Sequence, residues 1–175
     1  MSKNLNKSEF ETKIGKFYYL WEDKASRIVI YYLGNNKKDF GNFIRDIEKI
    51  YGDTGRIYLI DKKSNEIETA ITGYLDGKIK KFDFEVEFLA GTDFQKRIWH
   101  KLASVRHGET ISYKRLSSLS GYERAWRAAG SALSRNPVML VVPCHRVIKS
   151  DGKIGRFAGG PELKEFLVNL EKGTD

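Results

Sequence analysis

The stretch ETISYKRLSSLSGYERAWRAAGSALSRNP, residues 109–137, carries the pattern that decides the fold of the second half of the chain. Ser112 can cap a short helix, because a serine hydroxyl accepts from the free N–H groups of a first helical turn. Gly121 ends that helix, and a second helix is predicted from about Tyr122 to Ser134. Two short helices around a glycine-containing turn are typical of a helix-turn-helix.

The predicted second helix contains AAGSA (128–132), a run of small residues that lets a helix approach another backbone closely. Tight packing inside a core and close approach to a nucleic acid both fit this run. Arg124, Arg127 and Arg135 on or near the same helix favour the nucleic-acid interpretation, because basic side chains pair with phosphates.

Further helices are predicted on both sides of this stretch. Thr92 followed by Gln95 has the form of a capping box, which starts a helix. The last helix is predicted to begin at Pro161, a residue suited to the first helical position, and to stop at Gly173. We place a domain boundary at about residue 90, where this helical pattern begins.

Residues 1–90 indicate an N-terminal domain that contains both helices and strands, with a small antiparallel sheet. Aromatic and β-branched runs separated by short polar links favour strands, and apolar residues at helical spacing favour helices. The whole chain is therefore assigned to the α+β class, with a mainly helical, winged helix-turn-helix-type domain at 91–175. The predicted elements of the first domain are strands at 16–22, 27–34 and 56–61, helices at 39–52 and 64–77, and a strand or connector at 81–88.

Composition restricts the class of protein. The hydrophobic share of 41% is enough for a normal core, and no stretch approaches the ~20 apolar residues of a membrane span. The polar first residues give no sign of a signal peptide. One cysteine excludes an internal disulfide framework and fits a reducing compartment. We expect a soluble cytoplasmic protein, or a nuclear one if the source is eukaryotic.

The basic excess is confined to the second half. Residues 1–90 hold 16 Lys and Arg against 15 Asp and Glu, whereas residues 91–175 hold 15 against 8. A localised positive charge suggests a polyanionic partner, most simply nucleic acid. A solvated, soluble surface accounts for the same excess, so charge alone does not decide between them.

The one cysteine, Cys144, lies between Pro143 and His145 in MLVVPCHRVIKSDGKIGRFAGG (139–160). A lone cysteine is often an inert, buried hydrophobe. Here the proline forces a turn after an apolar run, the next residue can take the thiol proton, and a glycine-rich loop follows. Because the thiolate is the nucleophile, a nearby base favours a reactive cysteine.

These residues resemble the O6-alkylguanine-DNA alkyltransferases, also called methylated-DNA–protein-cysteine methyltransferases. PCHRV (143–147) carries the resemblance, which extends over residues 91–172. The supporting motifs keep the same order and spacing, and they are ISY (111–113), RAAG (127–130), NPV (136–138) and GRFAGG (155–160).

The resemblance implies DNA repair without a cofactor. The family binds duplex DNA through a helix-turn-helix in the minor groove and flips the damaged base into the protein. The cysteine then takes the alkyl group from O6 of guanine, or from O4 of thymine, and is spent after one turnover. Independently of the resemblance, we expect a monomer with no obligate protein partner, because the sequence contains no extra apolar helix that would need one.

Residue roles follow from the same resemblance. Cys144 is the expected nucleophile, His145 the general base acting through a water, and Glu171 the carboxylate that orients the histidine. Asn136 is expected to order the cysteine loop, and Tyr113 to donate to the flipped base. Lys114, Arg127 and Ser150 are expected to contact DNA, with Arg127 filling the vacated place in the stack. Val147, Phe157, Ala158 and Met139 are expected to line the substrate pocket.

The chain departs from the family pattern in three places. Phe157 replaces a tyrosine found in many relatives, so one hydroxyl near the pocket is missing. Met139 replaces a proline found in some, which changes the pocket mouth. Residues 1–90 contain no cysteine and no histidine, so we expect no zinc site of the kind some members have.

Three other functions fit parts of the sequence. An alkyltransferase-like protein, which binds the lesion without reacting, lacks the cysteine that this chain has. A helix-turn-helix regulator needs base-reading side chains, which the small-residue helix offers sparsely. A cysteine hydrolase needs an oxyanion-hole motif, and we find none. Alkyl transfer to Cys144 is the interpretation that the sequence favours.

Overall fold

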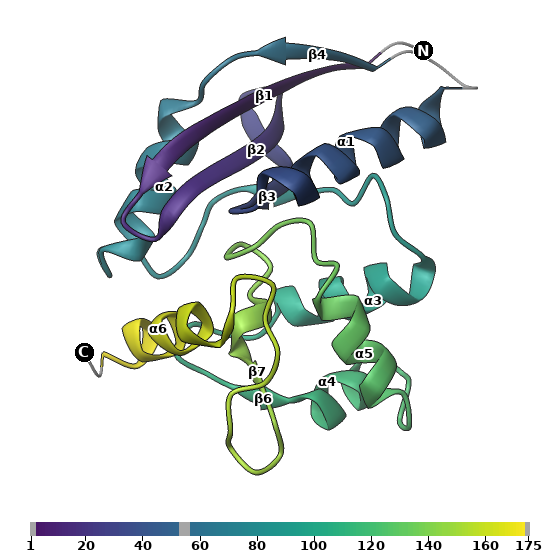
Figure 1. Ribbon diagram of the computed structural model, residues 1–175, viewed down its shortest axis with the longest axis vertical. Helices are drawn as coiled ribbons and strands as arrows, with labels where there is room; N and C mark the ends of the chain where they lie inside the picture. The colour runs from purple at the N-terminus through teal and green to yellow at the C-terminus, as the bar shows by residue number, and fades with distance from the viewer. Residues whose placement is uncertain (1–2, 53–56, 174–175) are drawn as a thin grey trace.

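The computed structural model of the chain describes residues 3–52 and 57–173. The first half of the chain forms a five-stranded sheet in the order β4-β1-β2-β3-β5, of which β1 to β4 are labelled in Figure 1. Its central strands pair antiparallel, while β4 and β5 pair in parallel with β1 and β3. The strands are β1 (Lys3–Thr12), β2 (Gly15–Lys24), β3 (Arg27–Gly34), β4 (Ile57–Asp61) and β5 (Glu85–Val86).

The predicted α+β character of this half is confirmed, with two differences in detail. The hairpin β2–β3 and the helices α1 (Lys37–Tyr51) and α2 (Asn65–Leu75) lie where the sequence placed them. Strand β1 was not predicted, and it turns the expected antiparallel sheet into a mixed one because β4 returns parallel to it. Only two residues of the 81–88 segment pair as a strand, and the rest is connector.

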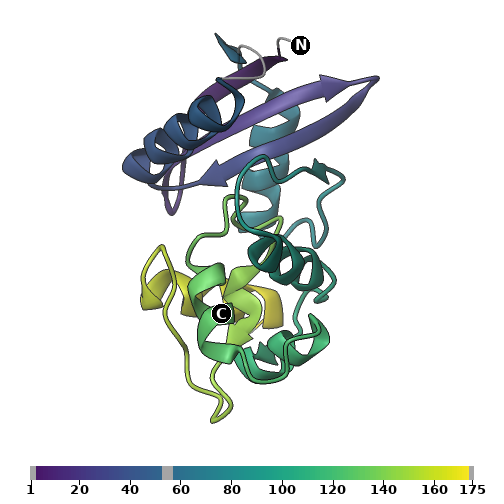
Figure 2. The ribbon, with the colours of Figure 1, turned by 90° about the vertical axis from the view of Figure 1, so that its right-hand side faces the viewer.

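The sheet is buried on both faces. Along β2, Phe17, Tyr19 and Trp21 face one apolar cluster, and Tyr18 and Leu20 face the other. This alternation follows from the period of two along a strand. Helix α1 covers the second cluster, while α2 packs on the first, so the two helices lie on opposite sides of the sheet (Figure 2).

The second half is helical, as predicted. It contains α3 (Asp93–Ala103), α4 (Tyr113–Leu119), α5 (Trp126–Leu133) and α6 (Pro161–Lys172). The capping box of Thr92 and Gln95 is present, and Ser112 Oγ accepts from the N–H of Arg115. A two-stranded parallel sheet of β6 (Ile111–Ser112) and β7 (Val147–Ile148) lies beside the helices. None of the helices in the described ranges is long and apolar enough to cross a membrane.

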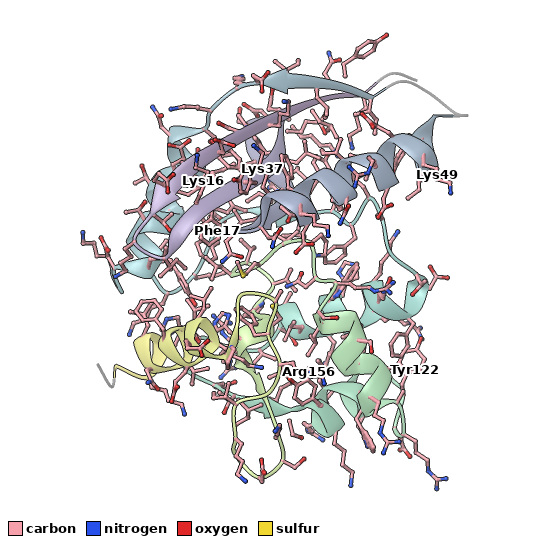
Figure 3. All side chains as sticks on the ribbon, in the orientation of Figure 1. Lys16, Phe17, Lys37, Lys49, Tyr122 and Arg156 are labelled. Carbon is pink, nitrogen blue, oxygen red and sulfur yellow. The ribbon has the colours of Figure 1, made fainter. Side chains whose placement is uncertain are left out.

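The predicted start of the second helix of the helix-turn-helix was wrong by four residues. Helix α5 begins at Trp126, and Tyr122 to Ala125 form the turn before it. The N–H of Tyr122 donates to the carbonyl of Ser117 at 2.9 Å, and the Ser117 hydroxyl donates back to the carbonyl of Tyr122. These bonds hold Tyr122 to the end of α4, at the edge of the molecule (Figure 3).

The two halves share an apolar core and a backbone junction. Phe17 of β2, near the lower edge of the sheet in Figure 3, belongs to the same cluster as residues of α3, α5 and α6. At the junction, the N–H of Leu33 donates to the carbonyl of Pro137 at 2.8 Å, and the N–H of Met139 donates to the carbonyl of Leu33 at 2.7 Å. The end of β3 therefore holds the segment that leads to Cys144.

Candidate active site

Cys144 opens a single turn of 3₁₀-helix (Cys144–Arg146) directly after the buried run. The residue is only 6% exposed. Asn136 ties the loop together, because its Nδ2 donates to the carbonyl of Val142 at 2.7 Å and to Cys144 Sγ at 3.3 Å. Its Oδ1 accepts from the N–H of Val138 at 3.1 Å. One side chain thus fixes the loop and contacts the sulfur.

His145 is fully buried and faces the last helix. Its Nε2 lies 2.7 Å from Glu171 Oε1 and 3.1 Å from the hydroxyl oxygen of Tyr74. Its other ring nitrogen, Nδ1, is the one buried side-chain polar atom without a hydrogen-bond partner in the part of the chain that the structure describes. Burial lowers the pKa of His145 despite the opposing effect of Glu171, so the imidazole is neutral near pH 7.

Glu171 is the acceptor around which this cluster is built. Arg146 donates to its carboxylate from Nε at 2.9 and 3.1 Å and from Nη2 at 2.8 Å. The N–H of Gly108 donates to Oε2 at 3.0 Å, and the hydroxyl of Tyr74 donates to Oε1. Burial alone would raise the pKa of Glu171, but the hydrogen bonds from His145 and its neighbours outweigh it and hold the pKa well below its usual range.

The thiol itself is not activated at rest. Burial raises the pKa of Cys144, and the hydrogen bond from Asn136 and the charge of Lys164 offset this only in part. Cys144 is therefore a protonated thiol near neutral pH. A nucleophilic thiolate requires a base that can accept its proton, and an unengaged nitrogen of the adjacent histidine is such a base.

Lys164 is a fully buried cation on α6. Its Nζ donates to the carbonyl of Val147 at 2.5 Å, and it lies 3.4 Å from both the hydroxyl of Tyr113 and the carbonyl of Arg156. Burial lowers the pKa of Lys164 to about 8. The lysine therefore links the tyrosine and the cysteine segment by hydrogen bonds, and it retains most of its charge at neutral pH.

A groove of about 600 Å³ lies along the helix-turn-helix face. It brings together four residues predicted to contact DNA, namely Tyr113, Lys114, Arg127 and Ser150. Basic side chains lining it also include Lys149 and Arg156, and no acidic residue lines it. Arg156 lies in the loop ahead of α6 (Figure 3). The groove is thus a positively charged surface beside the buried cysteine segment.

Close packing around Tyr113 explains why two neighbouring positions, Gly155 and Gly130, have no side chain. A Cβ at Gly155 would lie 2.3 Å from the Tyr113 hydroxyl, and a Cβ at Gly130 would lie 3.6 Å from the ring. The small-residue run of α5 therefore lets Tyr113 pack against the helix backbone. Burial raises the pKa of Tyr113, and the nearby Cys144 adds to the rise, so its hydroxyl keeps its proton at neutral pH.

The residues predicted to bind substrate are distributed over two neighbouring regions. Met139 and Ala158 line a second cavity of about 390 Å³ at the junction of the two halves, together with Asn136. Val147 is buried with its carbonyl bound by Lys164, and Phe157 is half-buried near the same lysine. Ser134 lines both this cavity and the basic groove, so the two adjoin at the end of α5.

Comparison with known proteins shows the family and the fold. The family model described as 6-O-methylguanine DNA methyltransferase, DNA binding domain, matches residues 93–173. A methylated-DNA–protein-cysteine methyltransferase of Methanosarcina acetivorans is 32% identical over 162 residues, which is 93% of this chain and 95% of the relative. The chain belongs to the methylated-DNA–protein-cysteine methyltransferase family.

Other members are also similar. The methyltransferase of Methanosarcina barkeri is 44% identical over 109 residues, covering 62% of this chain and 68% of the relative. A crystal structure of Mycobacterium tuberculosis OGT in complex with DNA matches with a TM-score of 0.76 at 27% identity, over 98% of this chain and 94% of that one. DNA is therefore the partner class that the family and fold indicate.

Three residues of the candidate site were not predicted from the sequence. Arg146 lies inside PCHRV, but no role was assigned to it. Lys164 could have been found, because a lysine three residues before Leu167 and seven before Glu171 lies on the inward face of α6. Tyr74 carried no signal, since it lies in the other half of the chain and reaches the site only through the fold.

Proposed function

We propose that this chain repairs duplex DNA by moving the alkyl group from O6 of guanine, and from O4 of thymine, irreversibly onto Sγ of its own Cys144. The observation that carries the proposal is the buried thiol held by Asn136 and followed directly by a neutral, buried His145 paired with Glu171. The lesion-binding alternative without transfer is disfavoured by the presence of this cysteine.

In the proposed transfer, these residues and one water account for every proton moved and every bond formed or broken. Cys144 loses its thiol proton through a water to Nδ1 of His145, whose Nε2 is oriented by Glu171. The sulfur forms a bond to the alkyl carbon as the bond from that carbon to O6 breaks. Tyr113 passes its hydroxyl proton to the leaving guanine, which would otherwise depart as a poor anion, and the tyrosine oxygen takes a proton back from the neighbouring Lys164. Lys164 lies within reach of the Tyr113 hydroxyl and supports its donation.

The basic groove is the proposed DNA-binding surface. Lys114 and Ser150 contact phosphates, and Tyr113 rotates the phosphate next to the flipped nucleotide. Arg127 fills the space that the base leaves in the stack. Its guanidinium now lies over the ring of Trp126, 4.3 Å from the centroid. Phosphate contacts of this kind make binding weaker as salt rises.

The flipped guanine is proposed to lie against the glycine-rich loop. The carbonyls of Cys144 and Val147 accept from its amino group, and the Val147 carbonyl retains a second lone pair beside the bond from Lys164. The N–H of Ala158 donates to O6. Met139 and Phe157 border the space for the alkyl group.

Residues 91–175 carry binding and chemistry, and residues 1–90 form a supporting domain. The protein acts as a monomer in the cytoplasm, on the nucleoid, or in the nucleus of a eukaryotic source, and it needs no cofactor and no metal.

Intact mass after mixing with an excess of duplex carrying one O6-methylguanine tests the reaction. We expect every chain to gain one methyl group, located by peptide mapping to the segment that contains Cys144. No mass change with retained preference for the lesion duplex would favour the lesion-binding alternative. No change and no preference would leave only a basic DNA-binding domain.

Replacing Arg127 by alanine is expected to slow methyl transfer from duplex DNA by about tenfold, because flipping costs a few kcal/mol of lost stacking that the arginine helps to offset. Reaction with free O6-methylguanine base should change much less, since no duplex must be held open. Arg124→Ala is the matched control, because Arg124 is exposed in the preceding turn and does not line the groove. Equal losses on both substrates would remove the stacking role of Arg127.

A further inference from the structure

Tyr74 is the one side chain of the N-terminal half that donates to Glu171 in the described part of the chain. It lies at the end of α2 and is 1% exposed. Its hydroxyl donates to Glu171 Oε1 and lies 3.1 Å from Nε2 of His145. The Tyr74 hydroxyl therefore contacts both His145, which follows Cys144, and Glu171, although neither residue is near Tyr74 in sequence.

The hydrogen bonds among Tyr74, His145 and Glu171 determine which atoms carry the protons. Glu171 is held as a carboxylate by Arg146 and can only accept hydrogen bonds. The single hydroxyl proton of Tyr74 points to Glu171, so the Tyr74 oxygen presents lone pairs toward His145. Nε2 thus faces two acceptors, Glu171 Oε1 at 2.7 Å and the Tyr74 oxygen at 3.1 Å. A neutral imidazole in this position carries its proton on Nε2.

The same count leaves Nδ1 with a free lone pair. This is the buried nitrogen that has no hydrogen-bond partner in the described residues. An unprotonated Nδ1 can accept a proton, whereas the other tautomer would have a proton there already and could not act as a base. The tautomer of His145 therefore decides whether it can take the thiol proton of Cys144.

We propose that Tyr74 is a positioning residue that fixes His145 in the Nε2–H tautomer, through hydrogen bonds that span the two halves of the chain. This inference rests on the proposed alkyl transfer to Cys144 and gives the N-terminal half a direct part in it. Glu171 accepts from Nε2, and Tyr74 adds a second acceptor and occupies a lone pair of the carboxylate, so that the two residues together hold the proton on Nε2.

The position of the Tyr74 hydroxyl is enforced by packing. The ring lies 5.0 Å from that of Phe82 and 6.1 Å from that of His107, measured between centroids. Ile71 and Ile67, one and two turns earlier on α2 respectively, are fully buried in the shared core. Burial, together with Glu171, raises the pKa of Tyr74, so its hydroxyl stays protonated throughout the neutral range.

Tyr74→Phe removes the hydroxyl and keeps the ring. We expect methyl transfer from O6-methylguanine duplex under single-turnover conditions to slow about tenfold, the scale of one hydrogen bond to a charged group. In ¹⁵N NMR of the full chain, wild-type His145 should give one protonated and one unprotonated nitrogen, with the proton on Nε2. The variant, in which Glu171 Oε1 is the acceptor that remains for Nε2, should show a larger share of the tautomer with its proton on Nδ1.

Tyr19→Phe is the matched control. Tyr19 is also fully buried in the N-terminal half, and its hydroxyl donates to a carboxylate, that of Glu68, at 2.8 Å. Because this pair does not contact His145, the transfer rate should stay within about twofold of wild type, even though a buried hydrogen bond is lost. Lesion binding should be unchanged in both variants.

The inference is overturned by a Tyr74→Phe rate equal to that of wild type, or by a slower rate with an unchanged tautomer. A wild-type His145 with its proton on Nδ1 also overturns it, even if the variant does not fold. The proposed function fails separately, through absence of methyl on wild-type Cys144, a result that the tautomer measurement does not influence.

Discussion

Replacing Cys144 by serine is expected to lower the rate of methyl transfer by more than about a thousandfold, as the loss of a catalytic nucleophile does. A serine hydroxyl ionises far less readily than a thiol, and burial already raises the pKa of the thiol itself. The residue is otherwise a close substitute, because Asn136 Nδ2 can donate to an oxygen as it does to Sγ. Preference for duplex DNA with O6-methylguanine should therefore be retained.

Intact mass and lesion-duplex binding measured on the same preparations check this expectation. Ser134→Ala is the control, since Ser134 borders both cavities but its hydroxyl donates to the carbonyl of Ser131 and not to the sulfur. It should transfer methyl at close to the wild-type rate. Methyl gain by Cys144→Ser would mean that another side chain is the acceptor, and it would overturn the assignment of the nucleophile.

The helical half was predictable because its signals are local. The Thr92–Gln95 capping box, Ser112 and Pro161 each act through the backbone of one turn, and the structure has helices starting at all three. The start of α5 was missed because no side chain caps it. The N–H of Tyr122 is instead hydrogen-bonded to Ser117 of the preceding helix, and the spacing of apolar residues does not reveal this interaction.

Strand β1 was not predictable from hydrophobic pattern. Leu5 is its one fully buried residue, and apart from the partly buried Phe10 the remainder is polar or charged. The strand forms because β2 and β4 offer backbone partners on both sides. Its presence makes the sheet mixed, so the expected small antiparallel sheet was right about the central hairpin and incomplete at the edges.

The candidate site likewise contains residues that could be predicted from the sequence and one that could not. Cys144 and His145 are adjacent in sequence, and Asn136 and Glu171 followed from the family resemblance, so these four were predicted. Tyr74 belongs to the same hydrogen-bonded cluster but lies 97 positions from Glu171. Its contribution depends on how α2 packs across the junction, which no motif in either half encodes.

Glu171→Gln is expected to slow methyl transfer by about a hundredfold or more, the scale of lost general-base catalysis. The amide has one acceptor oxygen, whereas the carboxylate accepts from Arg146, His145, Tyr74 and the N–H of Gly108. The amide nitrogen can also donate to Nε2, which favours the tautomer with its proton on Nδ1. DNA affinity should be nearly unchanged, because Glu171 does not line the groove.

The same variant should lose about 3–5 kcal/mol of folding free energy, the usual result of leaving a buried charge without its partner. The orphaned charge is that of Arg146, whose side chain is 9% exposed. Glu165→Gln is the matched control, since Glu165 lies on the same helix and is exposed. It should leave the transfer rate and stability close to wild type.

The pH dependence of this stability loss follows from the sign of the shift in Glu171. Its pKa in the folded chain lies well below the ordinary value of 4.5, because bonds from His145 and Arg146 outweigh burial. A carboxylate with a lowered pKa stabilises the fold fully above its ordinary pKa and loses that contribution as pH falls toward its folded pKa. Chemical denaturation of wild type and Glu171→Gln should therefore show a constant gap at neutral pH that narrows below about pH 4.5. A gap that stays constant into acid would mean that the lost stability comes from packing rather than from the carboxylate charge.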